Sequence, residues 1–511
     1  MAKPTVKYAG VQKSDRKGNK PKKYALPKKY RGAAAVLAAS LCLALLIYLA
    51  YSLPALGLAE KAGLAVILLA VSGKLIAWTL QVPGAAGLFI LRTSRGVRFI
   101  ERISRRQKRF WQALVDWGFV LSFGIFSLIL FRRYVSRKMF LFGMLSILAM
   151  QLFVLPYTLV AIGLINTPQL SLQQSSSYVP SSAGIADYLS YAFVGLSLIG
   201  GFSLYLVANL VYIAVIIVHG IGAFLVAASV SAPAAHAAAG SLPGPAGVPV
   251  FAIPFMKPSI ALPLILSLIL LVSLHEMAHG VMLKRYGKKI KSVGTFLFGI
   301  IPLGAFVEPD ERDVSRLPVK SQDKISIAGV SFNFFLSIIF FALMFAMLYY
   351  VLPGFTSTAV YIESVQHGAP AYNVIPAGAI VYKWNGYRIS SIQDLEAAAS
   401  SDFPGSTVSV ATSAGNYSLT ANATGKIGVL LGEEVIPTGG ALSAAINFLY
   451  AFFALSFLLN FYVAIFNILP LPMLDGWRIY KLRMGRRSLM IVTAVALTVM
   501  VLLFVPWIWS L

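Results

Sequence analysis

Long runs of apolar residues, separated by short polar segments, follow one another along most of the chain after residue 32. A helix needs about 20 apolar residues to cross the hydrocarbon core of a bilayer. Runs of about that length cover residues 33–53, 61–82, 139–162, 187–229, 259–283, 325–351, 441–470 and 488–510. This pattern predicts a polytopic α-helical membrane protein with about eight to ten spans.

Two apolar segments do not fit a single straight crossing. The 187–229 run is about twice as long as one span needs, so residues 200–201 or 208–209 could break it into a hairpin. The segment 111–131 is apolar, but basic residues flank both of its ends. Because basic flanks favour the cytoplasmic side, this segment is either a crossing or a re-entrant or tilted element.

A different pattern of short β-rich runs and turn residues occupies residues 353–436. It predicts a small α+β domain outside the membrane. The expected strand, turn, helix and strand lie in that order at 379–384, 385–386, 392–399 and 407–410. Together with the preceding Gly-Ala-Pro-Ala of residues 368–371, this order resembles a PDZ domain. The resemblance implies that the domain binds an extended peptide by adding a strand to the edge of a sheet.

Composition and charge support the membrane assignment. Charged residues make up 12% of the chain, against about 25% in soluble domains. The net charge of +25 is concentrated in clusters, and eleven lysines and arginines fall within the first 31 residues. Basic segments beside apolar spans mark the cytoplasmic side and contact anionic headgroups of the lipid bilayer. We therefore predict a cytoplasmic N-terminus and no nucleic-acid partner.

The clearest chemical signal lies inside the apolar run 259–283, where the sequence reads His-Glu-Met-Ala-His. His275 and His279 are four residues apart, so they share one face of a helix and can bind one metal ion. Glu276 lies beside His275 and can act as a base on water at that metal. Ionisable groups inside a span are costly and usually functional, so the pattern favours a metal site over isolated polar residues.

A third metal ligand is expected from a distant span, because zinc in hydrolytic sites usually has three protein ligands. The chain has one cysteine, Cys42, so a cysteine-based site within the chain is excluded. Asp475 is the candidate, because it follows the apolar run 441–470 in a proline-rich segment. Its alternative role is an interfacial ion pair with Arg478 or Lys481. The positive-inside rule brings the histidines and Asp475 to the same side of the membrane.

These motifs resemble the site-2 protease family of intramembrane zinc metalloproteases, in its PDZ-containing prokaryotic or archaeal type. The resemblance covers about residues 245–487. It rests on His-Glu-x-x-His, on the PDZ-like insert, and on Asn-x-x-Pro-x-Pro-x-Leu-Asp-Gly beginning at Asn467. A further family pattern, Gly-x-x-x-Asn, begins at Gly329, although Val330 stands where members often have proline.

The resemblance implies the chemistry of the site. It implies one Zn²⁺ per chain, bound by His275, His279 and Asp475, with Glu276 as the catalytic base. Asn333 and Asn467 fall at family positions and are expected to support the substrate or transition state, although Asn467 has the alternative of a helix–helix hydrogen bond. Residues 293–310 look like the family's membrane-dipping β-loop, with an ordinary interfacial loop as the alternative.

The predicted function is hydrolysis of peptide bonds in or near the transmembrane segments of single-span membrane proteins. The active site is expected towards the cytoplasmic side of the cell membrane and the PDZ-like domain outside. Rival functions are a PDZ-bearing scaffold or receptor with a structural metal, a cation transporter, and a prenyl-protein peptidase. The predicted regions are a basic cytoplasmic tail (1–32), an N-terminal transmembrane region of unassigned role (33–230), a catalytic transmembrane core (231–352), the PDZ-like domain (353–436) and a C-terminal transmembrane region (437–511).

Overall fold

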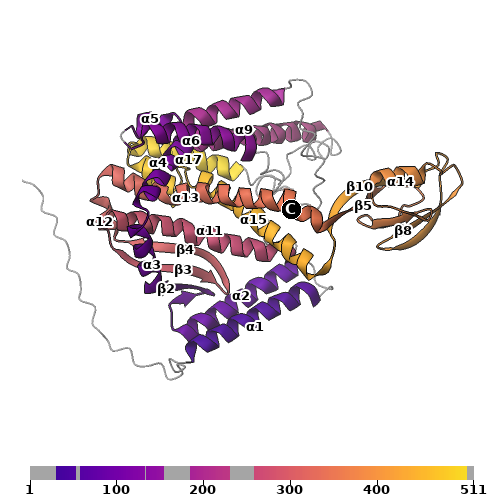
Figure 1. The fold of residues 1–511 in the computed structure, drawn as a ribbon, viewed down its shortest axis with the longest axis horizontal. Coiled ribbons are helices and arrows are strands. Elements are labelled where there is room, and N and C mark those ends of the chain that lie inside the picture. Colours follow the sequence, from indigo (N-terminus) through magenta and orange to yellow (C-terminus); the bar gives the residue numbers. More distant parts are fainter. Residues whose placement is uncertain (1–29, 53–57, 133, 155–184, 231–257, 503–511) are drawn as a thin grey trace, which may run out of the picture. The chain divides into compact units, whose positions relative to one another are not determined.

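The computed structural model describes most of the chain as two units (Figure 1). The described residues are 30–52, 58–132, 134–154, 185–230 and 258–502. The first unit contains the described residues up to Ile90 together with Leu297–Ile301, and the second contains the others. Most of the predicted basic tail, the start of the predicted catalytic core and the end of the last apolar run lie outside the described residues.

Two apolar helices, α1 (Arg31–Ser52) and α2 (Leu58–Leu80), pack against each other in the first unit. After α2, the antiparallel strands β1 (Gly84–Ala85) and β2 (Leu88–Thr93) form a hairpin. The two turn residues between them have φ values of 52° and 85°. Positive φ at both positions is what a two-residue hairpin turn needs to match the twist of its strands.

Three apolar helices form the core of the second unit, and each packs against the other two (Figure 1). They are α11 (Pro258–Arg285), α13 (Val319–Ala346) and α15 (Gly440–Phe466). A fourth helix, α4 (Lys108–Phe123), packs against α13. At that contact a Cβ added to Gly118 would lie 1.8 Å from Ser331 Oγ, so glycine permits the close approach of the two helices.

Shorter elements surround this core. They are α3 (Ser94–Arg105), α5 (Phe126–Leu130), α6 (Arg137–Ala149) with a π-helical turn at Met150–Val154, α12 (Glu311–Ser315), α16 (Asp475–Lys481) and α17 (Arg486–Leu502). A π-helical turn (Met347–Val351) and a 3₁₀ turn (Leu352–Gly354) extend α13.

The apolar segment 111–131 is divided between α4 and α5 at Gly124, which has a φ of 53°. Helix α4 has 16 residues and buries eleven of them, whereas a crossing helix needs about 20. The segment is therefore not one continuous crossing helix. Of the two predicted possibilities, this arrangement favours the re-entrant or tilted element.

Helix α9 (Ile185–Val230) reverses its direction at Gly201, where φ is 66° and ψ is −166°. The ring of Phe193 lies 6.1 Å from that of Tyr205 and 6.0 Å from that of Tyr212. In a straight helix these residues would be about 18 and 28 Å from Phe193. The predicted hairpin at residues 200–201 is thus confirmed, and the alternative break at 208–209 is wrong.

Six helices among the described residues are long and apolar enough to cross a membrane. They cover Gly63–Leu80, Arg137–Val154, Ala192–Val226, Leu262–Arg285, Val319–Gly354 and Gly440–Phe466. The prediction of eight to ten spans therefore exceeds what these residues show. The difference arises because α4 is short, because the described apolar part of α1 ends at Leu46, and because the last run extends beyond the described residues.

The β module (Thr356–Pro437) is a six-stranded antiparallel sheet with the order β10-β5-β6-β8-β9, in which β7 also pairs with β6. Its elements are β5 (Thr356–Val365), β6 (Ile380–Trp384), β7 (Tyr387–Arg388), α14 (Ile392–Ala399), β8 (Thr407–Thr412), β9 (Gly415–Thr420) and β10 (Val429–Pro437). Strand side chains such as Val360, Val381 and Val408 form its own buried core. The predicted strands, turn and helix are confirmed, and the assignment to the PDZ type stays a prediction.

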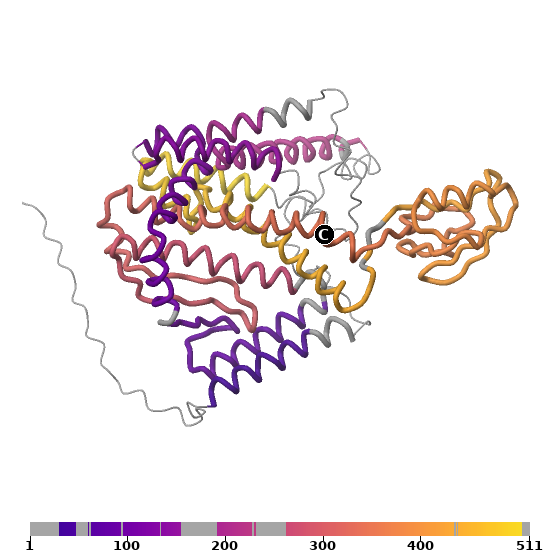
Figure 2. The backbone as a smooth tube through the Cα atoms, in the orientation of Figure 1, coloured from indigo at the N-terminus to yellow at the C-terminus, as the bar shows by residue number. Residues whose placement is uncertain are grey.

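A β-hairpin follows α11, with β3 at Ile290–Phe298 and β4 at Ile301–Pro309 (Figure 2). In the sheet order, β3 lies between β2 and β4, which makes β4 the last strand. Most of residues 293–310 therefore lie in paired strands, as the predicted β-loop requires.

The reversal of α9 gives a test of the fold. Replacing Gly201 by alanine would put a Cβ 2.3 Å from the carbonyl carbon of Ser122 in a backbone region that is essentially restricted to glycine. We expect Gly201→Ala to lower the free energy of unfolding by about 1–3 kcal/mol. Thermal unfolding of the detergent-solubilised protein measures the change.

Gly222→Ala is the matched control, because Gly222 lies in the same helix and a Cβ there meets nothing within 4 Å. Alanine in a helix interior is favoured over glycine by up to about 1 kcal/mol, so this variant should be at least as stable as the wild type. Equal stability of the two variants would contradict the reversal.

Candidate metal centre

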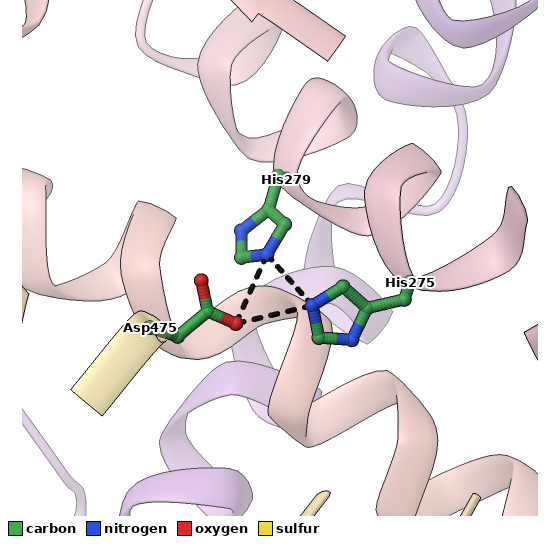
Figure 3. A group of neighbouring side chains, drawn as sticks. All are labelled: His275, His279 and Asp475. Atoms are coloured by element: carbon green, nitrogen blue, oxygen red, sulfur yellow. Dashed lines mark hydrogen bonds and ion pairs between the residues drawn. The ribbon is translucent and has the colours of Figure 1, made fainter. Parts of the chain in front are cut away.

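Two imidazoles project from one face of α11 towards the same point (Figure 3). His275 and His279 are four residues apart on this helix, so their side chains lie one turn apart. Their ring centroids are 4.9 Å apart, and their Nε2 atoms are separated by 3.2 Å. The helical spacing thus brings together the two histidines that the sequence singled out.

Asp475, the first residue of α16, meets both imidazoles (Figure 3). Its Oδ2 lies 3.1 Å from His275 Nε2 and 3.2 Å from His279 Nε2. This oxygen is buried and has no hydrogen-bond partner among the described residues. The structure therefore places Asp475 with the histidines and not in the alternative ion pair.

A glycine next to Asp475 lets the chain turn at this point. The Gly476 N–H donates to the carbonyl oxygen of Asn467, over 2.6 Å, just after α15 ends. A Cβ on Gly476 would lie 2.1 Å from the carbonyl oxygen of Ile468. The glycine of the Leu-Asp-Gly motif therefore allows α16 to start against the end of α15, which directs Asp475 towards α11.

The triangle of ligand atoms has the size of a zinc site. One ligand atom from each of His275, His279 and Asp475 lies within 4.8 Å of the others. Tetrahedral zinc with bonds of about 2.0–2.1 Å places its ligand atoms about 3.3 Å apart. The separations of 3.1–3.2 Å between the two Nε2 atoms and Oδ2 are close to that value. Two imidazoles and one carboxylate also form a donor set typical of hydrolytic zinc sites.

Space for an ion is kept open by Gly329 of α13. A Cβ at this position would lie 2.5 Å from the Nε2 atoms of both His275 and His279. A larger residue would therefore occupy the space beside the metal-facing nitrogens. This close approach gives a physical reason for the glycine of the Gly-x-x-x-Asn pattern.

The orientation of His279 is fixed by a backbone group. Its Nδ1 lies 2.7 Å from the carbonyl oxygen of Ile325 in α13. A carbonyl can only accept, so Nδ1 carries the proton and the lone pair of Nε2 points at the ligand triangle.

Glu276 is half-buried and contacts the β-hairpin. The backbone N–H of Val307 in β4 donates to Glu276 Oε2 over 3.1 Å. This bond holds the carboxylate between the helix that carries the histidines and the last strand of the sheet.

The two asparagines of the predicted site differ in their surroundings. Asn467 Nδ2 lies 3.5 Å from His275 Nε2, so it approaches the ligand triangle directly. Asn333 is fully buried in α13, one turn after Gly329, and both of its amide atoms lack a hydrogen-bond partner among the described residues. Such an unsatisfied buried amide requires an explanation, for example water or a substrate.

Sequence reasoning missed two groups at this site, the Ile325 carbonyl and the Val307 N–H. Both are backbone atoms, and every residue except proline carries the same pair. No signal in the sequence distinguishes them, because their role depends only on where α13 and β4 pass the site.

Comparison with known proteins agrees with this geometry. Residues 263–506 match the model of peptidase family M50. An uncharacterized protein from Methanocaldococcus jannaschii is 31% identical over 224 residues, which cover 43% of this chain and 56% of that protein. The chain thus spans about half the length of this relative. The region that matches the family model contains both motifs that form the ligand triangle, and this part of the chain is similar to peptidase family M50, the site-2 protease family of metalloendopeptidases.

Proposed function

We propose that this protein is an intramembrane zinc metalloprotease that hydrolyses peptide bonds in or near the transmembrane segments of membrane-tethered substrates. The proposal rests mainly on the triangle of ligand atoms from His275, His279 and Asp475, which lies beside Glu276. A purely structural metal site has no need of the adjacent carboxylate. The apolar helices around the triangle support a reaction at membrane depth.

His275, His279 and Asp475 would hold one Zn²⁺ through Nε2, Nε2 and Oδ2. A zinc ion at this position supplies Lewis acidity, which polarises a carbonyl and lowers the pKa of water to about 7. The hydrogen bond from His279 Nδ1 to Ile325 keeps its Nε2 unprotonated for this purpose.

Glu276 is assigned the proton transfers. The Val307 N–H fixes Oε2, and we assign Oε1 to take the proton from the attacking water and to deliver it to the leaving amine. Asn333 and Asn467 are the polar groups that we assign to the substrate carbonyl, because both come from the elements that surround the ligand triangle. Amide donors directed at developing negative charge stabilise a transition state.

The substrate would bind as an extended strand along β4. A transmembrane helix must unwind before its peptide bond can be attacked, and an unwound backbone in lipid needs hydrogen-bond partners. The last strand of a sheet offers such partners, and β4 already contacts Glu276 through Val307. A substrate paired with β4 would therefore pass the catalytic carboxylate.

The β module is proposed to be a PDZ-like domain that binds or screens the part of the substrate outside the membrane. Its sheet and its helix α14 supply the strand edge and flanking helix that peptide binding by strand addition uses. The basic residues within 284–291, at the end of α11 and just after it, and those within 478–487, after Asp475, favour the cytoplasmic side for the metal centre and the outside for this module.

The catalytic base gives a test of the mechanism. Glu276→Gln should reduce cleavage by about 10²- to 10⁴-fold, because it removes general acid–base catalysis while keeping the shape of the side chain. Zinc content should stay at the wild-type level, since Glu276 is not a member of the ligand triangle. Cleavage of a single-span substrate in proteoliposomes and metal analysis of the same preparation measure both effects.

His275→Ala is the companion variant, and it should lose zinc as well as activity. Normal cleavage by Glu276→Gln would contradict the mechanism. A wild-type protein that binds zinc tightly but cleaves no membrane-tethered substrate recovered with the Glu276→Gln variant would favour a scaffold or receptor.

The space beside the two histidines gives a test of where the ion binds. Gly329→Ala places a methyl group 2.5 Å from both Nε2 atoms, so the variant should bind zinc at least about tenfold more weakly than wild type. Chelator competition measures the affinity, and Gly222→Ala serves as the control. Unchanged zinc affinity would show that the ion lies elsewhere.

A further inference from the structure

Three consecutive residues near the start of α13 each contact a different part of the protein. The carboxylate of Asp323 binds Arg483, which follows α16. The ammonium of Lys324 binds Asp116 of α4. The carbonyl of Ile325 accepts the hydrogen bond from His279 of α11. One turn of α13 therefore connects the metal helix, the element after Asp475 and the N-terminal region.

Asp323 is fully buried and makes two hydrogen bonds with the guanidinium of Arg483, of which the Nη1–Oδ1 bond is 2.7 Å long. Tyr134 donates its hydroxyl to Asp323 Oδ2 over 3.0 Å. Burial and the Asp323 carboxylate raise the pKa of Tyr134 to about 12, so this hydroxyl keeps its proton. The guanidinium also lies 4.3 Å from the ring centre of Phe131. Tyr134 and Phe131, which both lie outside the region that matches the family model, thus contact this ion pair.

Lys324 is 1% exposed, and its Nζ lies 2.5 Å from Asp116 Oδ1. Gln112 donates a second hydrogen bond to the same oxygen over 3.3 Å. Asp116 and Gln112 belong to α4, which lies outside the region 263–506 that matches peptidase family M50. The N-terminal region therefore supplies the counter-charge for a lysine of the catalytic core.

Buried ion pairs of this kind contribute little net stability, because desolvation offsets most of the attraction between the charges. Their better-supported effect is to select one arrangement of the helices that carry them. Here the selected arrangement has direct consequences for the metal centre. A shift of α13 would move both the Ile325 carbonyl that orients His279 and Gly329, which lies against both histidines. A displacement of about 1 Å can reduce catalysis about 10²-fold.

We propose that Asp323 and Lys324 are positioning residues for the metal centre and that residues 108–134 of the N-terminal region form part of its framework. Lys324 and Asp116 fix α13 against α4. Asp323, Arg483 and Tyr134 fix the same turn of α13 against the segment that follows α16, the helix that begins with Asp475. The inference rests on the proposed metal site, and it assigns a function to helices that the family match does not include.

The test uses a double variant of the full-length protein, Asp116→Asn with Lys324→Met, which removes both charges and leaves no unpaired buried charge. We expect a folded protein whose metal-free form melts close to the wild type, since neutral replacements of buried pairs are usually tolerated. Its zinc affinity should fall about ten- to hundredfold, as for other residues that orient metal ligands. The ligand-field spectrum of bound Co²⁺ should also change, which a purely structural role would not produce.

Glu101→Gln is the matched control. Glu101 of α3 also forms an ion pair with the metal helix, with 3.8 Å between its Oε1 and Lys284 Nζ, but its side chain is 41% exposed. Exposed pairs contribute little, so this variant should keep wild-type zinc affinity. Tyr134→Phe removes one hydrogen bond from Asp323 and leaves the ion pair, so it should give a smaller loss than the double variant.

A double variant with wild-type zinc affinity and an unchanged Co²⁺ spectrum would overturn the proposal. A double variant that fails to fold would overturn it as well, because the pair would then serve the fold as a whole. Failure of the wild-type protein to bind zinc is a separate outcome that would contradict the proposed protease function itself.

Discussion

Two imidazoles and one carboxylate converge in a triangle about 3 Å on each side, and much of the second unit is arranged around that contact. Placing polar groups among apolar helices is costly unless every group has a partner. Several elements provide partners for His279 and Glu276 and position Asp475. Helix α13 contributes the Ile325 carbonyl, which accepts from His279, and Gly329, which leaves space beside both histidines. Strand β4 contributes the Val307 N–H, which donates to Glu276, and the turn before α16 directs the Asp475 carboxylate towards α11.

The same constraint explains why helix α4 packs so closely against α13. Helix α4 buries eleven of its 16 residues, and it contacts α13 through the close approach of Gly118 to Ser331 and through paired aromatic rings such as Trp111 and Phe332. The buried carboxylate of Asp323 is paired with Arg483, and the buried ammonium of Lys324 is paired with Asp116 of α4. In this account, α4 is a structural part of the metal centre, although it belongs to a region with no recognisable motif.

The elements that the sequence predicted well share a local physical cause. The four-residue spacing of His275 and His279 determines a common helix face, and the turn at Asn385-Gly386 has the positive φ values that a hairpin needs. The reversal at Gly201 was predictable because the apolar run is twice the length of a span and contains two adjacent glycines. In each case a few neighbouring residues decide the structure.

Other features depend on contacts between distant segments and could not be predicted in this way. The pair of Lys324 and Asp116 joins residues 208 positions apart, and each resembles an ordinary charge near the end of an apolar run. The division of segment 111–131 follows from the packing of Gly124 against the turn of α9. A hydropathy profile cannot predict this contact between distant segments. Among the described residues, six helices are long and apolar enough to cross a membrane, fewer than the eight to ten predicted spans, in part because apolar length alone does not separate a crossing helix from a buried one.

X-ray absorption at the zinc edge of the purified, zinc-loaded protein reports which side chains bind the ion. We expect a first shell of nitrogen and oxygen ligands at about 2.0–2.1 Å that includes two imidazoles, one of which is lost in His279→Ala. A shell without imidazole, or one that His279→Ala leaves unchanged, would contradict the proposed metal centre.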